Sequence, residues 1–227
     1  MNILLIEDDP VIARQIQQDF AAWQYTVSTP TDFHDIMKDV ATMNPQLVLI
    51  DIQLPAFDGF HWCRQIRATS NVPIIFLSSR DQPLDMIMAM QLGADDYVQK
   101  PFHMDILRTK VQALLRRTYD YQETPKESPS FHGAQVDYAA STVTRDGQTI
   151  ELTKNEQFIL KVLLETPDEI VSRDELMRRL WDDERFVNDN TLTVNVNRLR
   201  GKLEELGLVN VIMTKKGLGY VAVTRDV

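Results

Sequence analysis

Acidic, hydroxyl and ammonium side chains follow four apolar runs in the first half of this sequence. They are Glu7 with Asp8, Asp51, Ser78 and Lys100. The runs are short, rich in β-branched residues and bounded by turn signals, which is typical of buried strands. Because the carboxyl ends of parallel strands meet at one edge of an open sheet, we expect these side chains to converge in one crevice. Such a combination of groups predicts a phosphoryl site.

Carboxylates gathered in one crevice repel one another. A close pair costs about 4 kcal/mol at an effective dielectric near ~20, which a purely structural site would avoid. A divalent cation removes this repulsion, and oxygen-only ligands favour a hard ion such as Mg²⁺, which joins carboxylates to a phosphate. Lys100 adds a mobile positive charge and Ser78 a hydroxyl donor. The alternative is that each acid is a solvated loop residue and Lys100 a surface lysine. Their placement after successive strands favours the site.

Strand-like and helix-like segments alternate up to residue 118. This alternation predicts an α/β doubly wound (βα)5 domain with a parallel sheet covered on both faces. Residues 119–130 lose the periodicity and contain two prolines, as a semi-extended linker would. We therefore place the domains at residues 1–118 and 131–227, joined by this linker. The helices of the first domain are expected near residues 10–22, 32–42, 58–68, 83–92 and 104–118.

The second half changes to short strands and helices, which predicts an α+β domain. Asp146-Gly147 between β-prone runs is a hairpin turn signal. A further helix is expected after residue 190 to about residue 206, and a final hairpin at 210–223 turns through residues 215–219. Two capping boxes each begin an amphipathic helix, namely Thr153 with Glu156 and Ser172 with Glu175.

The composition limits where nucleic acid could bind. The 227 residues carry a formal net charge of −9, so the overall field of the protein does not favour nucleic acid. Any such surface must be local. The single cysteine, Cys63, cannot form an internal disulfide, and we find no signal peptide and no apolar run of roughly 18 residues. We therefore expect a soluble, cytoplasmic chain.

The helix that begins after residue 190 separates into two sides at roughly 100° per residue. Its apolar stripe is formed by Leu192, Val196, Leu199 and Leu203. The side predicted to lie opposite is polar and basic, and is formed by Thr191, Asn195, Arg198 and Lys202. Arginine can contact guanine or phosphate and asparagine suits adenine, so we predict that this side contacts double-stranded DNA. Lys215 and Lys216 of the final hairpin are expected to contact the backbone beside the groove. An ordinary solvated face fits the helix alone about as well.

Motifs of the first half resemble the receiver domain of two-component response regulators. They are Ile3 to Asp9, Leu49 to Pro55 with Asp58-Gly59, Leu77 to Arg80, and Gly93 to Phe102. The resemblance implies that Asp51 accepts phosphate from a histidine kinase. It also implies that Mg²⁺ is held by Asp8, Asp51 and the backbone carbonyl of Gln53. Further implied roles are that Glu7 acts on the metal through water, that Ser78 and Lys100 contact the phosphoryl group, and that Tyr97 is an aromatic switch.

Residues 131–225 resemble the winged helix-turn-helix effector domain of the OmpR/PhoB family. Thr191 to Arg200 fills the recognition-helix pattern, and Lys216 to Tyr220 fills the wing. The resemblance implies binding to double-stranded DNA, and the linker is long enough for tandem binding to a direct repeat. Three positions depart from the family pattern: Val221 replaces an arginine of the wing, and Asn195 and Asn197 replace the commoner His and Arg.

The family resemblance also implies a homodimer after phosphorylation, formed through the fourth helix, the fifth strand and the fifth helix. Charge pairs hold this face in the family. Met86 and Ile106 stand where the usual Lys and Glu would form one such pair. We therefore expect a dimer that is less sensitive to salt than the family norm. Two other pairs are retained, Asp96 with Lys110 and Asp95 with Arg117.

Further motifs resemble the regulators of bacitracin and cationic antimicrobial-peptide resistance in Firmicutes, the BceR/GraR type. They are Asn71 to Pro73 followed by Ser78 to Asp81, Phe60 to Arg64, and Gln99 to Phe102. This resemblance implies a membrane-bound sensor histidine kinase that works with a peptide-sensing ABC transporter. It also implies control of transporter genes, with RNA polymerase as a further candidate partner.

Two other functions are compatible with parts of the sequence. A Mg²⁺-dependent phosphohydrolase could use Asp51 as its nucleophile, but such enzymes commonly place a general-acid carboxylate two residues later, where this chain has Gln53. A receiver adaptor with a protein-binding output domain is disfavoured by the basic side of the helix at 191–202. We therefore expect a transcriptional regulator and no turnover of an external substrate.

Overall fold

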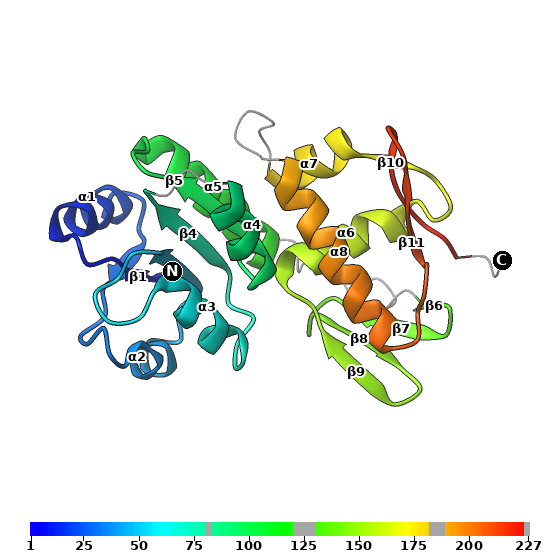
Figure 1. Cartoon of the computed structure of the whole chain (residues 1–227), viewed down its shortest axis with the longest axis horizontal. Coiled ribbons are helices and arrows are strands. Elements are labelled where there is room, and N and C mark those ends of the chain that lie inside the picture. The colour runs from blue at the N-terminus through cyan, green and yellow to red at the C-terminus, as the bar shows by residue number, and fades with distance from the viewer. Residues whose placement is uncertain (80–82, 120–129, 182–188, 225–227) are drawn as a thin grey trace. The chain divides into compact units, whose positions relative to one another are not determined.

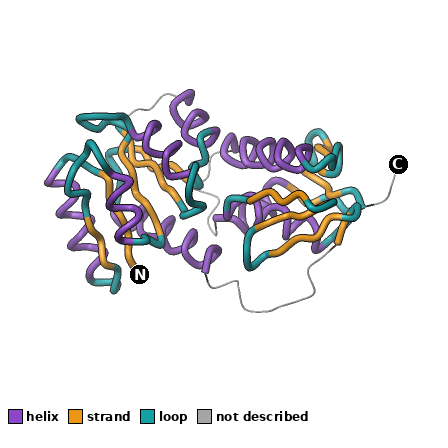
Figure 2. The backbone as a smooth tube through the Cα atoms, turned by 90° about the horizontal axis from the view of Figure 1, so that it is seen from below, coloured by secondary structure: helices purple, strands orange, loops and turns teal. Residues whose placement is uncertain are grey.

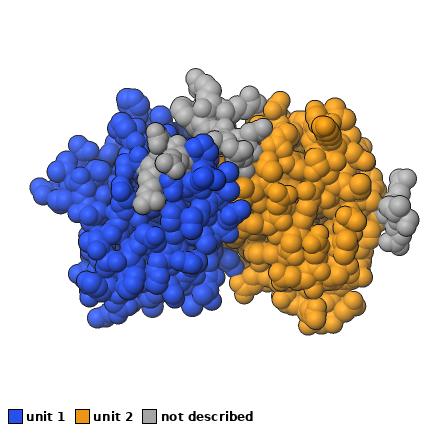
Figure 3. All heavy atoms as spheres, viewed as in Figure 1, with its two compact units in different colours: residues 1–115 blue, residues 116–227 orange. Residues whose placement is uncertain are grey.

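The computed structural model describes residues 1–79, 83–119, 130–181 and 189–224. The chain divides into two compact units, Met1–Leu115 and Arg116–Val227 (Figure 3). Each unit contains its own sheet structure. The predicted linker at 119–130 lies outside the described residues, except for its first and last positions.

The first unit is built on a parallel sheet with the strand order β2-β1-β3-β4-β5. The chain passes from β1 to β2 on one side of β1 and returns to β3 on the other side, so the topological switch point lies between β1 and β3. Every residue of β3 and of β4 is buried, as expected for strands covered on both faces. The doubly wound fold predicted from the sequence is confirmed. The strands are β1 (Asn2–Ile6), β2 (Thr26–Ser28), β3 (Leu47–Asp51), β4 (Ile74–Ser78) and β5 (Asp96–Gln99).

Helices cover both faces of this sheet, with α1 and α5 on one face and α2 and α3 on the other (Figure 1). Aspartate side chains cap the starts of two of these helices. The Asp9 carboxylate accepts a hydrogen bond from the backbone N of Val11 at 2.7 Å, and Asp58 accepts one from the backbone N of His61 at 2.8 Å. The helices are α1 (Pro10–Ala21), α2 (Ile36–Met43), α3 (Gly59–Arg67), α4 (Pro83–Gln91) and α5 (Met104–Tyr119).

Gly59 allows the start of α3 to lie directly against the end of β3. Its backbone N donates to the carbonyl of Ile52 at 2.9 Å. A Cβ atom at position 59 would lie 2.1 Å from the carbonyl oxygen of Asp51, which no side chain tolerates. The glycine therefore fixes how closely α3 approaches the backbone that carries Asp51.

The second unit contains an antiparallel sheet of order β6-β7-β8-β9, a smaller sheet of order β10-β12-β11, and helices (Figure 2). The α+β class predicted from the sequence is confirmed. Its strands are β6 (Ser130–Phe131), β7 (Ala134–Asp137), β8 (Thr142–Arg145), β9 (Gln148–Glu151), β10 (Val171–Ser172), β11 (Ile212–Lys215) and β12 (Gly219–Ala222). Its described helices are α6 (Lys154–Glu165), α7 (Arg173–Trp181) and α8 (Asp189–Glu205).

Local sequence signals place these elements. Thr153 and Glu156 form the predicted capping box at the start of α6. Ser172 accepts a hydrogen bond from the backbone N of Glu175 at 3.1 Å, at the start of α7. Asp146 and Gly147 have positive φ angles of 51° and 80°, as a tight turn between β8 and β9 requires. Among the described residues, no helix is long and apolar enough to cross a membrane.

Candidate functional site

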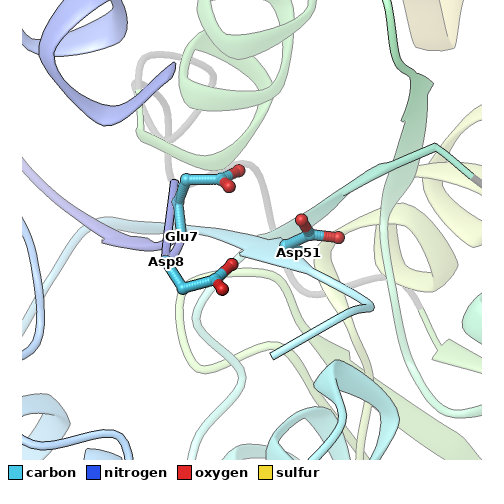
Figure 4. Close-up of side chains that lie close together, drawn as sticks. All are labelled: Glu7, Asp8 and Asp51. Carbon is cyan, nitrogen blue, oxygen red and sulfur yellow. The ribbon is translucent and has the colours of Figure 1, made fainter. Parts of the chain in front are cut away.

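Three carboxylates meet at the switch point of the sheet. Glu7 follows β1 and Asp51 ends β3, the neighbouring strand, so the parallel pairing of these strands brings them together. Each of Glu7, Asp8 and Asp51 offers a carboxylate oxygen, and these oxygens all lie within 4.8 Å of one another (Figure 4). Glu7 and Asp51 are buried whereas Asp8 is exposed, so the cluster opens to solvent on the side of Asp8.

Lys100 contributes the positive charge of this site. Its Nζ lies 2.6 Å from Oε2 of Glu7 and 2.6 Å from Oδ2 of Asp51. Its backbone N donates to the carbonyl of Ser78 at 2.7 Å, which fixes the end of β5 against the end of β4. These distances bring Lys100 together with Glu7 and Asp51, two of the residues that were predicted to converge with it.

Burial and ion pairing act in opposite directions on these groups. Burial raises the pKa of Glu7 above its ordinary value, although the hydrogen bond from Lys100 opposes this shift. Burial lowers the pKa of Lys100, but the hydrogen bonds of its ammonium to Asp51 and Glu7 outweigh burial, so this pKa is raised overall. Lys100 is therefore positively charged at neutral pH, which stabilises the adjacent carboxylates.

Three further predicted residues of the first unit lie in the loop after β3, at the end of β4 and in β5. Gln53 donates its backbone N–H to Oδ1 of Asp51 at 3.0 Å. Ser78 is completely buried at the end of β4, next to β3 in the sheet. Tyr97 is 8% exposed in β5, so its side chain is largely removed from water. The roles of Ser78 and Tyr97 stay predictions.

The donor set of this site suits a hard divalent cation. All of its anionic ligand atoms are carboxylate oxygens, the ligands that Mg²⁺ prefers. Three carboxylates against one ammonium leave a formal charge of −2 at the site. Because that charge is held next to solvent at Asp8, a cation has both an attraction and an entry path.

The predicted DNA-contacting side of α8 is buried at two positions and paired within the second unit at the other two. Thr191 and Asn195 are buried, and Asn195 Nδ2 donates to the carbonyl of Thr191 at 2.9 Å. Arg198 lies 3.1 Å and Lys202 2.8 Å from the carboxylate oxygens of Glu156 in α6. The prediction that these four side chains lie opposite the apolar stripe is wrong. At roughly 100° per residue they lie only about a quarter turn from that stripe, so they pack on α6.

The solvent-facing side of α8 carries residues that the sequence reasoning missed. Asn197 is exposed, and Thr193 and Arg200 are partly exposed. Arg200 donates to the carbonyl of Ile212 and to the hydroxyl of Thr214, each at 2.8 Å. On a helical wheel this side lies about a quarter turn from the apolar stripe, on the flank away from the four predicted residues, so the wheel alone does not decide which flank faces solvent.

The hairpin of β11 and β12 carries the predicted lysines. Lys215 and Lys216 are exposed at its turn, where Gly217 has a φ of 74°. Gly219 lies against β10, and a Cβ atom there would lie 2.0 Å from the carbonyl oxygen of Val171. Gly217 therefore allows the turn of the hairpin, and Gly219 allows β12 to approach β10 closely. Its contact with DNA stays a prediction.

Comparison with known proteins identifies both units. Residues 3–112 match the response regulator receiver domain, and residues 147–222 match the C-terminal domain of transcriptional regulatory proteins. The chain is 55% identical over 225 residues to the sensory transduction protein BceR of Bacillus subtilis, with 99% of this chain and 97% of that protein covered. It is 47% identical over 222 residues to the response regulator protein GraR of Staphylococcus aureus, with coverages of 98% and 99%.

The chain belongs to the BceR/GraR family of response regulators. It is a DNA-binding response regulator, and the family consists of transcription regulators rather than of enzymes in general. A mutant of RitR has the same fold, with a TM-score of 0.78 at 22% identity and coverages of 97% and 98%. DrrB, an OmpR/PhoB homologue of Thermotoga maritima, gives a TM-score of 0.51 at 27% identity, with 98% of each chain covered.

The acids predicted to hold the dimer face of this response regulator already have partners within the chain. Asp96 lies 2.9 Å from the ammonium of Lys110. Asp95 accepts from Arg67 and from the backbone N of Ile74, each at 2.9 Å. Arg67 was missed in the sequence because nothing in its local pattern marks it as buried. Met86 and Ile106 are partly exposed and Arg117 is buried, and pairing across a dimer stays a prediction for all of these residues.

Proposed function

We propose that Asp51 is the phosphoacceptor of this response regulator and that its phosphorylation by a histidine kinase controls DNA binding. The observation that carries the proposal is the contact of Lys100 with both Asp51 and Glu7 at 2.6 Å, beside the exposed Asp8. A carboxylate held next to an ammonium and a cation-attracting cluster can attack the phosphorus of a donor while the charge of the incoming group is neutralised.

Mg²⁺ is the metal that this proposal requires, held by Asp8, Asp51 and the backbone carbonyl of Gln53, with Glu7 acting through water. When bound, it supplies positive charge that balances the phosphoryl oxygens. Lys100 orients the acceptor by its ion pair with Asp51. The backbone N–H of Gln53 holds the other oxygen of the same carboxylate, so the carboxylate group of Asp51 is fixed at both ends.

Phosphorylation of Asp51 adds negative charge close to Lys100 and Ser78. A phosphoryl group on Asp51 adds a charge of about −1.5 to −2 and new acceptor oxygens. Both Lys100 and the Ser78 hydroxyl are donors at the ends of neighbouring strands, so the new oxygens attract them. A shift of Ser78 opens space beside β4, which Tyr97 of β5 can fill. This movement would connect the phosphoryl site to the outer surface of α4, β5 and α5.

The output of this change is DNA binding by the second unit. The proposed DNA surface combines the solvent-facing side of α8, with Asn197 and Arg200, and the hairpin lysines Lys215 and Lys216. A homodimer formed after phosphorylation would carry two such surfaces and suit a direct repeat. Joining two binding modules raises avidity by roughly 10²–10⁴ when the geometry permits both to bind.

The genes under this control are proposed to be transporter genes for resistance to bacitracin and cationic antimicrobial peptides. This part of the proposal is supported by 55% identity to BceR and 47% identity to GraR over almost the whole chain. The upstream partner would be a membrane-bound sensor histidine kinase that works with an ABC transporter. RNA polymerase is the candidate partner at the promoter.

Phosphoryl uptake by the full chain tests the proposal. Wild type incubated with acetyl phosphate and Mg²⁺ should gain the mass of one phosphoryl group and associate, as measured by intact mass and light scattering. Asp51→Ala should do neither. Asp35→Ala is the matched control, because Asp35 is exposed and its side chain does not cap α2. Equal uptake by wild type and Asp51→Ala would refute the assignment.

A further inference from the structure

The hairpin of β11 and β12 receives little support from backbone pairing with the rest of the second unit. β11 lies at the edge of its sheet, and β12 pairs on its other side with β10, which contains only two residues. Lys215, the last residue of β11, and Lys216 are exposed at the turn. The spacing of these lysines from α8 therefore depends on side-chain contacts of the hairpin.

Two arginines hold one residue pair of this hairpin. Thr214 of β11 and Tyr220 of β12 lie directly opposite one another in the strand register. Arg200 of α8 donates to the hydroxyl of Thr214 at 2.8 Å. Arg173, the first residue of α7, donates to the hydroxyl of Tyr220. Because Thr214 immediately precedes Lys215, two helices hold the hairpin next to its exposed lysines.

The guanidinium of Arg173 connects α7 with both α8 and β12. Its Nη2 donates to Thr193 Oγ1 of α8 at 3.0 Å, and its Nη1 donates to the hydroxyl of Tyr220. Its Cζ lies 5.4 Å from the centre of the Tyr220 ring, close enough for a cation–π contact. Arginine presents its N–H donors in a rigid planar fork, whereas the lysine ammonium is a single point charge. The fork therefore fixes Tyr220 relative to Thr193, and with it the spacing of the hairpin from α8.

We propose that Arg173 is a positioning residue that holds Lys215 and Lys216 at the spacing from α8 at which the helix and the hairpin contact one DNA duplex together. The inference rests on the proposed DNA surface of α8 and the hairpin. Tyr220 is 2% exposed, so its side chain lies inside the unit and transmits the position of Arg173 to β12. A hairpin released from Arg173 loses its phosphate contacts although its lysines keep their charge.

A direct contact between Arg173 and a phosphate would have different consequences. A direct contact contributes independently of the hairpin, so its loss adds to the loss of the lysines. A positioning residue acts through the lysines, so its removal has no further effect once they are gone. Arg173→Lys separates the two cases as well, because it keeps the positive charge but loses the fork that holds both hydroxyls.

The test measures binding of the full chain to a fluorescent DNA duplex, selected by wild type from a random pool, by anisotropy at several salt concentrations. Arg173→Ala and Arg173→Lys should each weaken binding about tenfold, and Tyr220→Phe about two- to tenfold, the range that the lost hydrogen bonds support. Tyr220→Phe should also lower the slope of log K against log salt although it removes no charge, because the lysines leave the phosphates.

The same three substitutions are then made in a chain that carries both Lys215→Ala and Lys216→Ala, where none should weaken binding further. Tyr138→Phe is the matched control, because Tyr138 packs against the core of the second unit outside the β10-β12-β11 sheet. It should bind DNA like wild type. Tyr220→Phe keeps the buried ring, so it tests positioning even if Arg173→Ala unfolds the second unit, which thermal unfolding would show.

The contrary results are distinct for the two levels of the proposal. Wild-type binding by Tyr220→Phe, additive losses in the chain without the two lysines, or full rescue by Arg173→Lys would each overturn the role of Arg173. Wild-type binding after replacement of Arg200 and both hairpin lysines would instead show that the proposed DNA surface is wrong, and the inference with it.

Discussion

Replacement of Lys100 by glutamine tests the electrostatic basis of the phosphoryl site. The Lys100 side chain is 12% exposed and pairs with Glu7 and Asp51 at 2.6 Å each. Removal of one partner from a buried ion pair lowers the free energy of unfolding by about 3–5 kcal/mol, because the remaining charge stays in the protein interior without a partner. We expect Lys100→Gln to lower the free energy of unfolding of the first unit by about this amount in the absence of divalent cation.

Mg²⁺ should partly restore the stability of this variant. The substitution changes the formal charge of the site from −2 to −3, which strengthens the attraction for a divalent cation. A ligand that binds only the folded state stabilises it by RT ln(1 + [L]/Kd), so tighter binding gives a larger gain at the same concentration. We therefore expect Mg²⁺ to stabilise Lys100→Gln more than it stabilises wild type.

The stability of wild type and the stability of Lys100→Gln should depend differently on pH. The pKa of Lys100 is raised above 10.5 in the folded chain, because its ion pairs outweigh burial. A raised pKa of a basic group contributes stability that is fully present below pH 10.5 and is lost as the pH rises through the folded value. Wild type should therefore lose stability above pH 10.5 more steeply than Lys100→Gln.

Urea unfolding followed by hydrogen exchange of peptides from β1 and β3 measures the first unit separately from the second. Lys38→Gln is the matched control, because Lys38 is exposed on α2. The reasoning is refuted if Lys100→Gln is as stable as wild type without Mg²⁺, or if Mg²⁺ stabilises both proteins equally. Either result would mean that the Lys100 ammonium does not stabilise the carboxylates of this site in the folded state.

The other predictions concern backbone approach, a buried ion pair and the DNA surface. Gly59→Ala should destabilise the first unit by about 1–3 kcal/mol and reduce phosphoryl uptake, because its Cβ would lie 2.1 Å from the carbonyl oxygen of Asp51; thermal unfolding and intact mass measure both effects. Arg67→Ala should cost about 3–5 kcal/mol in urea unfolding, because it leaves the buried Asp95 without the guanidinium that lies 2.9 Å away. Arg200→Ala should weaken DNA binding and lower the slope of log K against log salt by about 1, as measured by fluorescence anisotropy.

Each of these substitutions has a matched control in the chain. Gly201→Ala places a methyl group in open space within α8 and should be neutral or stabilising by up to about 1 kcal/mol. Arg64→Ala removes an exposed arginine of α3 and should be near neutral. Arg198→Ala should reduce stability more than DNA affinity, because Arg198 pairs with the buried Glu156. A larger loss of DNA affinity for Arg198→Ala than for Arg200→Ala would contradict the corrected surface of α8.

The site of the first unit could be predicted more completely than the surface of the second, because it depends on strand order rather than on side-chain packing. Polar residues that follow buried strands are brought together by parallel pairing alone, so the meeting of Asp51 with Glu7 required no knowledge of side-chain packing. The partners of Asp95 could not be predicted, because Arg67 is distant in the sequence and reaches Asp95 only through tertiary contacts. On α8 the apolar stripe was correct, but the position of the polar side relative to it was misjudged by about a quarter turn.

The balance of charge distinguishes the ionic cluster of the first unit, which suits a cation, from that of the second unit, which joins two helices. At the switch point, three carboxylates meet one ammonium, which leaves a formal charge of −2 beside the exposed Asp8. In the second unit, Glu156 is completely buried and receives Arg198, Lys202 and the backbone N of Thr153, which leaves a formal charge of +1. The carboxylate of Glu156 is thus enclosed by its partners, and its ion pairs with Arg198 and Lys202 hold α8 against α6. The first cluster keeps an uncompensated negative charge beside solvent and so attracts cations, whereas the cations of the second are used to join two helices.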